Sequence, residues 1–185
     1  TRRSSDLSEN AAYTLGATTI NGNAVTGFKL GKSKQAGRFT SAAVGVSGEK
    51  YLNFYAQGWK GGDVTLYYRV DGGATMSQKL ASHDGVTGNP PYVSLAFAAT
   101  DHYSVKLNLT ETSTIEFSTD ANFELTASES AMASARAIVC GVKLSDEPIE
   151  GEDGGNTTPE PTPGGVMTIA EAIAAAANTA VIIEN

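Results

Sequence analysis

Alternating apolar and polar residues between Lys50 and Leu80, interrupted by two glycine pairs, constrain this chain more than any other stretch. At 51–59 the even positions are apolar or small and the odd positions are polar or aromatic, and the alternation returns at 63–70. Successive side chains of a strand point to opposite faces of a sheet, so each run is predicted to be a strand with one buried face. The glycine pairs predict turns, and the stretch is therefore expected to form an antiparallel meander.

The length of each turn follows from which side chains must be buried. A three-residue loop at 60–62 sets Phe54 opposite Tyr68, whereas a two-residue loop would mix the apolar and polar faces. The same reasoning predicts a second loop at 72–74.

Short alternating runs of this kind recur as far as residue 144. They lie at 13–20, 25–30, 39–46, 93–97, 103–109, 115–117, 123–125 and 138–144. In the last run, we expect Ile138, Cys140, Val142 and Leu144 to face inward. Roughly ten to twelve short strands with no long helical period predict an all-β fold, an antiparallel β-sandwich with a jelly-roll-like arrangement.

Composition divides the chain into four parts. Residues 1–12 are expected to be a flexible lead and 13–144 the sandwich domain. Residues 145–165 hold 4 of the 6 prolines and a block of acids, which predicts an extended linker. Residues 166–185 begin with a capping-box pattern and predict a short helix and the start of a strand, the truncated beginning of a second module.

Charge is unevenly distributed along the chain. Residues 1–144 carry 13 Lys and Arg against 12 Asp and Glu, and 145–185 carry 8 acids and no base, which together give the net charge of -7. The main domain therefore lacks the positive field that nucleic acid or an anionic membrane requires. No apolar run is long enough for a transmembrane helix. The first residues, TRRSSDLSEN, are polar, so any export signal is expected to have been removed or to lie outside this sequence.

Few residues are arranged for catalysis. Ser82, His83 and Asp84 are adjacent, whereas a catalytic triad needs residues that converge from separate elements. His102 is expected on an exposed polar face, and Cys140 is interpreted as a small buried hydrophobe. The domain is therefore predicted not to be an enzyme and to need no cofactor.

Calcium binding is an alternative that rests on four aspartates at predicted strand ends or loops, Asp71, Asp84, Asp101 and Asp120. Turns favour aspartate in any protein, so the positions also have a purely structural interpretation.

Aromatic and amide side chains gather on the predicted outer face of the meander. The candidate ligand-binding residues are Tyr51, Asn53, Tyr55, Trp59, Tyr67 and Arg69, with Gln57 on the same face. If the two strands pair as neighbours, Tyr55 lies beside Tyr67. Rings stack on the C–H face of a sugar and polar groups bond its hydroxyls, so carbohydrate binding or adhesion is predicted. Contact with a surface protein and plain packing are the alternatives.

Three segments carry a resemblance to a known module: LGKSKQAGRFT (30–40), LNFYAQGWKGGDVTLYYRV (52–70) and ARAIVCGVKL (135–144). They are similar to a β-sandwich module of exported Bacteroidetes lipoproteins. The tail VMTIAEAIAAAANTAVIIEN resembles the entry to an OB-fold module. The resemblance implies export to the cell surface or periplasm and carries over no catalytic residues. It adds two alternative roles, a structural spacer or protein-interaction domain of a surface lipoprotein and an accessory domain of a hydrolase.

Deleting 166–185 should leave the melting temperature of the sandwich nearly unchanged. The predicted helix at 168–177 is shorter than the roughly 12–15 residues that an isolated helix needs in water. Thermal unfolding of the full and shortened chains tests this, and a large drop would mean that the tail belongs to the core.

Overall fold

The computed structural model describes residues 10–16, 18–20, 22–59, 63–80, 97–125 and 135–151. Its elements are β1 (Ala12–Thr14), β2 (Thr18–Ile20), β3 (Asn23–Val25), β4 (Gly27–Leu30), β5 (Arg38–Thr40), β6 (Gly48–Gly58), β7 (Thr65–Val70), β8 (Met76–Lys79), the 3₁₀ turn η2 (Ala99–Asp101), β9 (His102–Leu109), β10 (Ile115–Ser118) and β11 (Ala137–Ser145).

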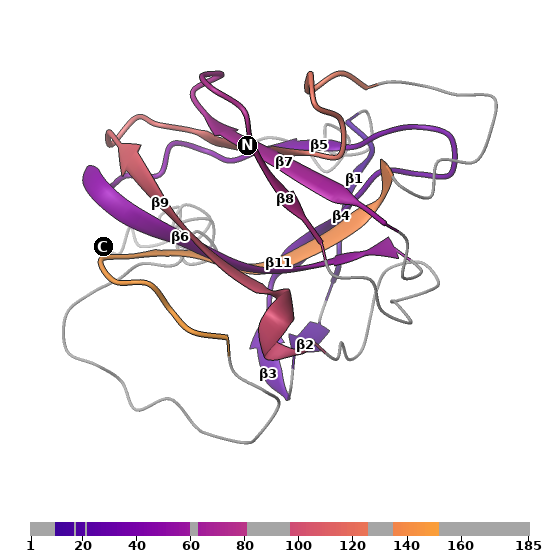
Figure 1. The fold of residues 1–185 in the computed structure, drawn as a ribbon, viewed down its shortest axis with the longest axis horizontal. Helices are drawn as coiled ribbons and strands as arrows, with labels where there is room; N and C mark the ends of the chain where they lie inside the picture. Colours follow the sequence, from indigo (N-terminus) through magenta and orange to yellow (C-terminus); the bar gives the residue numbers. More distant parts are fainter. Residues whose placement is uncertain are drawn as a thin grey trace, which may run out of the picture.

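Two antiparallel sheets face each other as the layers of a sandwich (Figure 1). One has five strands in the order β1-β4-β11-β6-β9, and the other has four in the order β5-β10-β7-β8. The hairpin of β2 and β3 forms a separate two-stranded sheet at one side of these layers (Figure 1). The predicted all-β sandwich is confirmed.

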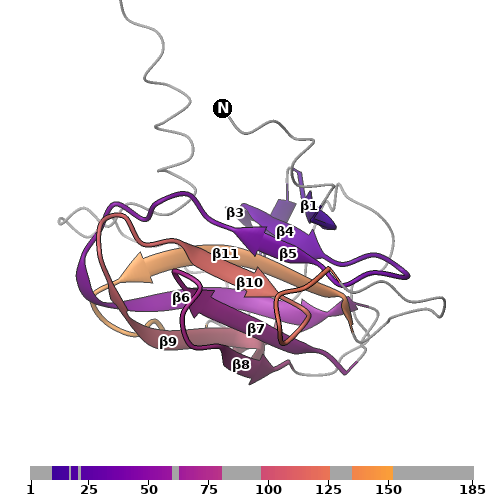
Figure 2. The same ribbon diagram turned by 90° about the horizontal axis from the view of Figure 1, so that it is seen from above.

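The strand pairs are nested. β7 pairs with β8, β6 with β9, β5 with β10 and β4 with β11, each pair antiparallel. The chain from β4 to β11 is therefore one long hairpin that has been rolled up, so that its successive pairs fall alternately in the two sheets (Figure 2). This is the winding of an eight-stranded jelly roll.

The main core fills the space between the two sheets. Its largest contributors are Phe28, Leu30, Leu52, Phe54, Leu66, Tyr68, Ile115, Phe117 and Val139, drawn from β4, β6, β7, β10 and β11. The Phe117 ring lies 5.4 Å from the Phe54 ring and 5.8 Å from the Phe28 ring, centroid to centroid. The predicted inward faces of β6 and β7 are confirmed by this burial.

The predicted pairing of β6 with β7 is wrong, because the two strands lie in different sheets. Phe54 and Tyr68 do meet, with ring centroids 6.2 Å apart, but across the core and not along a sheet. An apolar strand face can be buried beside a neighbouring strand of the same sheet or opposite a strand of a second sheet. The alternation alone does not distinguish these two arrangements. The predicted loop at 60–62 lies outside the described residues.

A β-bulge in β11 overturns part of the predicted inward face. Cys140 pairs with Tyr55 and Lys143 with Asn53, so β11 holds one extra residue between these pairs. Gly141 takes a φ of 60° there, a left-handed conformation that glycine adopts without strain. The extra residue reverses which positions of β11 face the main core. Ile138 and Cys140, which precede the bulge, were predicted to face inward but pack in a second cluster outside the main core. Leu144, which follows the bulge, faces the main core as predicted.

Other predicted strands are shorter or absent. The run 13–20 divides into β1 and β2, and β5 ends at Thr40. Residues 123–125 form no strand, since Phe123 has a φ of 58° and its N–H donates to the Asp120 carbonyl at 3.1 Å. Of the predicted run 93–97, only Phe97 is among the described residues. Most of the predicted lead (1–9), the linker after residue 151 and the second module at 166–185 also lie outside the described residues.

The turn between β7 and β8 lies one residue earlier than predicted. Tyr68 pairs with Met76, which leaves Asp71–Gly73 as the loop. Asp71 and Gly72 both have positive φ, and the Gly73 N–H donates to the Val70 carbonyl at 2.8 Å, as in a type I′ turn. The Asp71 carboxylate accepts the Thr114 N–H at 2.7 Å and the Ser113 hydroxyl at 2.8 Å, and these bonds anchor the turn to the segment before β10.

These bonds predict a pH dependence of stability. The Thr114 N–H first, and then the Ser113 hydroxyl, lower the pKa of Asp71 from its ordinary value because both donate to the charged form. The contribution of Asp71 is therefore complete above its unfolded pKa of about 3.9 and is lost as the pH falls through the lower folded pKa. Asp71→Asn should cost stability at neutral pH and should reduce the loss of stability on acidification below about pH 4.

Urea unfolding of wild type and variant across this range measures the effect. Asp63→Asn is the matched control, because Asp63 is 75% exposed and lies 3.7 Å from the Lys79 ammonium. Parallel acid profiles for wild type and Asp71→Asn would contradict the prediction.

Candidate functional site

The six predicted ligand-binding residues fall on two different surfaces. Tyr51, Asn53 and Tyr55 lie on β6 and Trp59 directly follows it, on the outer side of the five-stranded sheet, whereas Tyr67 and Arg69 lie on β7 in the other sheet. Tyr55 therefore does not lie beside Tyr67. The continuous aromatic face that the sequence predicted does not form.

Trp59 is buried, with 3% of its surface exposed, and its predicted position on an open edge is wrong. It packs in a second cluster outside the five-stranded sheet with Leu15, Ile20, Phe97, Ile138 and Cys140. The Lys29 ammonium lies 3.7 Å from the centroid of its ring, and the Arg136 guanidinium carbon 5.8 Å. The segments that hold Leu15, Ile20 and Phe97 form a layer over this part of the sheet, so the indole is a core side chain.

Two buried amide side chains of β6, those of Gln57 and Asn53, form hydrogen bonds to other segments of this layer. The buried Gln57 amide donates to the Asp101 carboxylate at 2.8 Å, and the same carboxylate oxygen accepts the Ala98 N–H. The Asn53 amide is fully buried, donates to the Ser145 hydroxyl at 2.8 Å and accepts the Ile149 N–H at 3.1 Å.

The Asn53 contacts fix the segment that leaves the sandwich. Ser145 is the last residue of β11, and its hydroxyl also donates to the Glu147 carbonyl at 2.5 Å. Lys50 and Asp146 form an exposed ion pair beside it. The first residues of the predicted linker therefore lie against the sheet.

Aromatic contacts account for Tyr55. Its ring meets the Phe97 ring at 5.6 Å and the His102 ring at 4.7 Å, both in edge-to-face geometry. His102 is consequently half-buried and not on an open polar face, and His83 lies outside the described residues. Tyr51 and Tyr55 keep partial exposure, but the groups around them belong to the covering layer.

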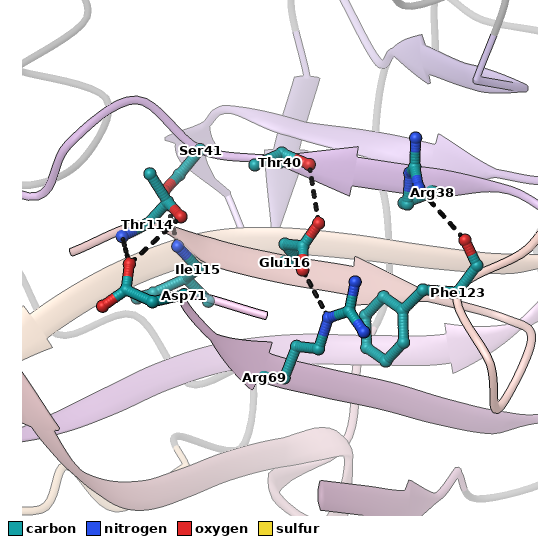
Figure 3. A network of polar contacts seen from close by, with 9 residues as sticks. All are labelled: Arg38, Thr40, Ser41, Arg69, Asp71, Thr114, Ile115, Glu116 and Phe123. Atoms are coloured by element: carbon teal, nitrogen blue, oxygen red, sulfur yellow. Dashed lines mark hydrogen bonds and ion pairs between the residues drawn. The ribbon is translucent and has the colours of Figure 1, made fainter. Parts of the chain in front are cut away.

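The outer surface of the four-stranded sheet presents a different arrangement, which we call the polar face: Arg38, Thr40, Tyr67, Arg69 and Glu116. Figure 3 draws all of these except Tyr67. Glu116 lies between Thr40 on β5 and Arg69 on β7 in the register of the sheet. The Arg69 Nε donates to one Glu116 oxygen, and the Thr40 hydroxyl lies 3.4 Å from the other. The alternation of β10 directs this carboxylate outward, because Ile115 and Phe117 on either side of it are buried in the core.

Phe123 connects the two arginines of the polar face. Its ring lies under the Arg69 guanidinium, 4.0 Å from the guanidinium carbon, and its carbonyl accepts the Arg38 Nη1–H at 3.1 Å. The side-chain exposures of Arg69 and Glu116 are 22% and 13%, so most of each side chain is covered and a smaller part reaches the surface. Tyr67, two residues before Arg69 on the same face, is partly exposed.

The sequence predicted two members of this polar face, Tyr67 and Arg69, and missed the other three. Arg38, Thr40 and Glu116 could have been noticed as polar residues alternating with hydrophobic residues on short strands. That these residues converge could not have been predicted, because β5, β7 and β10 are brought together by sheet pairing between distant parts of the chain.

No metal centre is found in the described part of the chain, where no three His, Cys, Asp or Glu side chains converge. Asp71, Asp101 and Asp120 each bond to their own surroundings, Asp120 through the Asn122 and Glu124 N–H groups, and Asp84 is outside the described residues. Burial raises the pKa of the Cys140 thiol well above its ordinary value, which disfavours the thiolate that a nucleophile needs. Nor does any helix among the described residues have the length and hydrophobicity to span a bilayer.

Comparison with known proteins identified no family. No family model matches the sequence, and no curated protein matches it. Two solved structures of exo-β-1,3-galactanase from Phanerochaete chrysosporium were matched, one with galactose at a TM-score of 0.36 and 16% identity, and one of a variant with β-1,3-galactotriose at 0.34 and 13%. Each match covers 70% of this chain and 26% of the galactanase chain, so this chain spans about a quarter of that enzyme. TM-scores below 0.5 do not establish a common fold, and the jelly-roll assignment comes from the strand order above.

Burial of Trp59 predicts that Trp59→Ala destabilises the domain by about 3–5 kcal/mol, the usual cost of truncating a buried aromatic. Tyr51→Ala in β6, the strand that ends just before Trp59, is the control and should cost less than half as much, because Tyr51 is partly exposed. Urea unfolding measures both, and equal stability of Trp59→Ala and wild type would contradict the burial.

Proposed function

We propose that this domain is a non-catalytic glycan-binding module whose ligand lies on the polar face. The observation that supports it is the Arg69–Glu116 pair, held between the Thr40 hydroxyl and the Phe123 ring at an accessible surface next to a partly exposed tyrosine. Of the two surfaces that carry predicted site residues, this one offers polar groups and a ring to a ligand. The other is covered by its own second layer.

The chemistry of the polar face suits sugars. A guanidinium offers several N–H donors and a carboxylate offers acceptors, and sugar hydroxyls bond to both. Charge assistance strengthens such bonds, and groups already held in place lose little freedom on binding. The Tyr67 ring can pack on the C–H face of a sugar while its hydroxyl remains available for hydrogen bonding.

The same face is poorly equipped for glycoside hydrolysis, which supports a binding role. Most glycosidases use two carboxyl groups on either side of the scissile bond. Glu116 is the one carboxylate of the polar face, and its charge is compensated by Arg69. An accessory domain of a hydrolase is compatible with this arrangement, since it would hold a polysaccharide while a neighbouring domain acts on it. We propose location at the cell surface or in the periplasm on the sequence resemblance.

A structural spacer is the second candidate, favoured by the fixed exit of the chain. Asn53 binds both Ser145 and Ile149, so the segment after β11 is held against the sheet as far as Ile149. A spacer needs such an exit and no ligand.

Tyr67→Ala should weaken polysaccharide binding by about 2 kcal/mol, some thirtyfold, without unfolding the domain. The test is a glycan array followed by affinity electrophoresis on the polymers retained, with Tyr51→Ala as the matched tyrosine control on the other sheet. Binding that is lost in Tyr67→Ala and kept in Tyr51→Ala supports the polar face. Binding lost in the control instead would move the site, and a wild type that retains no glycan would favour the spacer.

A further inference from the structure

Arg38 differs from the other cations near the polar face in having no acidic partner among the described residues. Arg69 pairs with Glu116, and Lys79 lies 3.7 Å from Asp63. The contact of the Arg38 guanidinium is a hydrogen bond to a neutral carbonyl, that of Phe123 at 3.1 Å. Among the described residues of this surface, Arg38 is therefore a cation whose recorded contact carries no opposite charge.

The position of Arg38 is set by backbone bonds on both sides. Its N–H donates to the Asn10 carbonyl at 2.9 Å, and it pairs with Ser118 across β5 and β10. The neighbouring Gly37 carbonyl accepts the Thr119 N–H at 3.1 Å. The Phe123 carbonyl then orients the guanidinium through one of its five N–H donors and leaves the rest for a ligand.

We infer that Arg38 is a subsite for a ligand carboxylate, so that the glycan bound on the polar face is a polysaccharide containing uronic acid residues. The inference rests on the proposed function and names the class of sugar. A guanidinium matches a carboxylate with two parallel hydrogen bonds, a geometry that a hydroxyl cannot reproduce.

The neighbours of Arg38 agree with this orientation of the ligand. Thr40 lies two residues along β5 on the same face, about 7 Å away, and contacts Glu116. The ligand carboxylate would lie at Arg38 and its hydroxyls at Thr40 and Glu116, where the Arg69 charge limits repulsion between the two carboxylates. The net charge of -7 belongs to the C-terminal part of the sequence, because residues 1–144 carry 13 Lys and Arg against 12 Asp and Glu, and 145–185 carry 8 acids and no base.

The experiment uses the full chain with three polymers: polygalacturonate, its methyl-esterified form and dextran sulfate. The variants are Arg38→Ala and Arg38→Gln, and the second keeps a donor for the Phe123 carbonyl but removes the charge. Lys79→Ala is the control, because it removes an exposed charge from the same sheet. Affinity electrophoresis and calorimetry measure binding, and thermal unfolding checks that each variant is folded.

We expect both Arg38 variants to bind polygalacturonate at least about tenfold more weakly than wild type, as for loss of a hydrogen bond to a charged group. Lys79→Ala should bind normally, and the esterified polymer should not distinguish the variants from wild type. Unchanged affinity in Arg38→Gln would overturn the inference. So would an equal loss in Lys79→Ala, or equally tight Arg38-dependent binding of dextran sulfate, since either would indicate general attraction of anions.

The two proposals fail in different ways. If a neutral glycan binds, depends on Tyr67 and is indifferent to Arg38, the carboxylate subsite is wrong and the glycan-binding module stands. If no polymer in this set or on the array binds, both are wrong.

Discussion

The packing of Phe117 between the two sheets is the interaction on which the rest of this structure depends. From β10 its ring meets aromatic rings of β4, β6 and β7, with centroid distances of 5.8 Å to Phe28, 5.4 Å to Phe54 and 6.5 Å to Tyr68. One side chain thus joins four strands and both layers. Because side chains alternate along a strand, burying Phe117 also directs Glu116 to the outer surface. The core and the polar face are therefore two consequences of the same placement of β10.

The two outer surfaces of the sandwich have become different because only one of them carries a second hydrophobic layer among the described residues. Outside the five-stranded sheet, Trp59 and Ile138 pack with Leu15 and Phe97, and Gln57 and Asn53 bond to the segments above them. Aromatic and amide side chains that could have faced a ligand are used for internal packing. On the four-stranded sheet, charged groups of neighbouring strands bond to one another, and Arg69 and Glu116 keep 22% and 13% of their side-chain surface exposed.

This difference gives the proposed function its physical basis. A surface recognises sugars when its polar groups are fixed in position but not fully satisfied, and when a ring is within reach. Phe123 holds two such polar groups in position. Its ring contacts the Arg69 guanidinium, and its carbonyl accepts a hydrogen bond from Arg38. Glu116 bonds to one of these arginines, Arg69, and the carboxylate subsite that we propose rests on the other.

Local alternation by itself determined which side chains are buried in the best-defined strands: it predicted Leu52 and Phe54 in the core and Tyr67 with Arg69 on an outer face. It could not determine which strands pair, because an apolar face is satisfied equally by a hairpin neighbour or by an opposite sheet, as the contact between Phe54 and Tyr68 shows. In β11 both faces are apolar, so the alternation did not show which face is directed to the main core. The bulge at Gly141 determines this. The candidate site was likewise decided by tertiary structure. Trp59 is buried by segments distant in sequence, and the polar face joins residues that only the nested pairing of β5, β10 and β7 brings together.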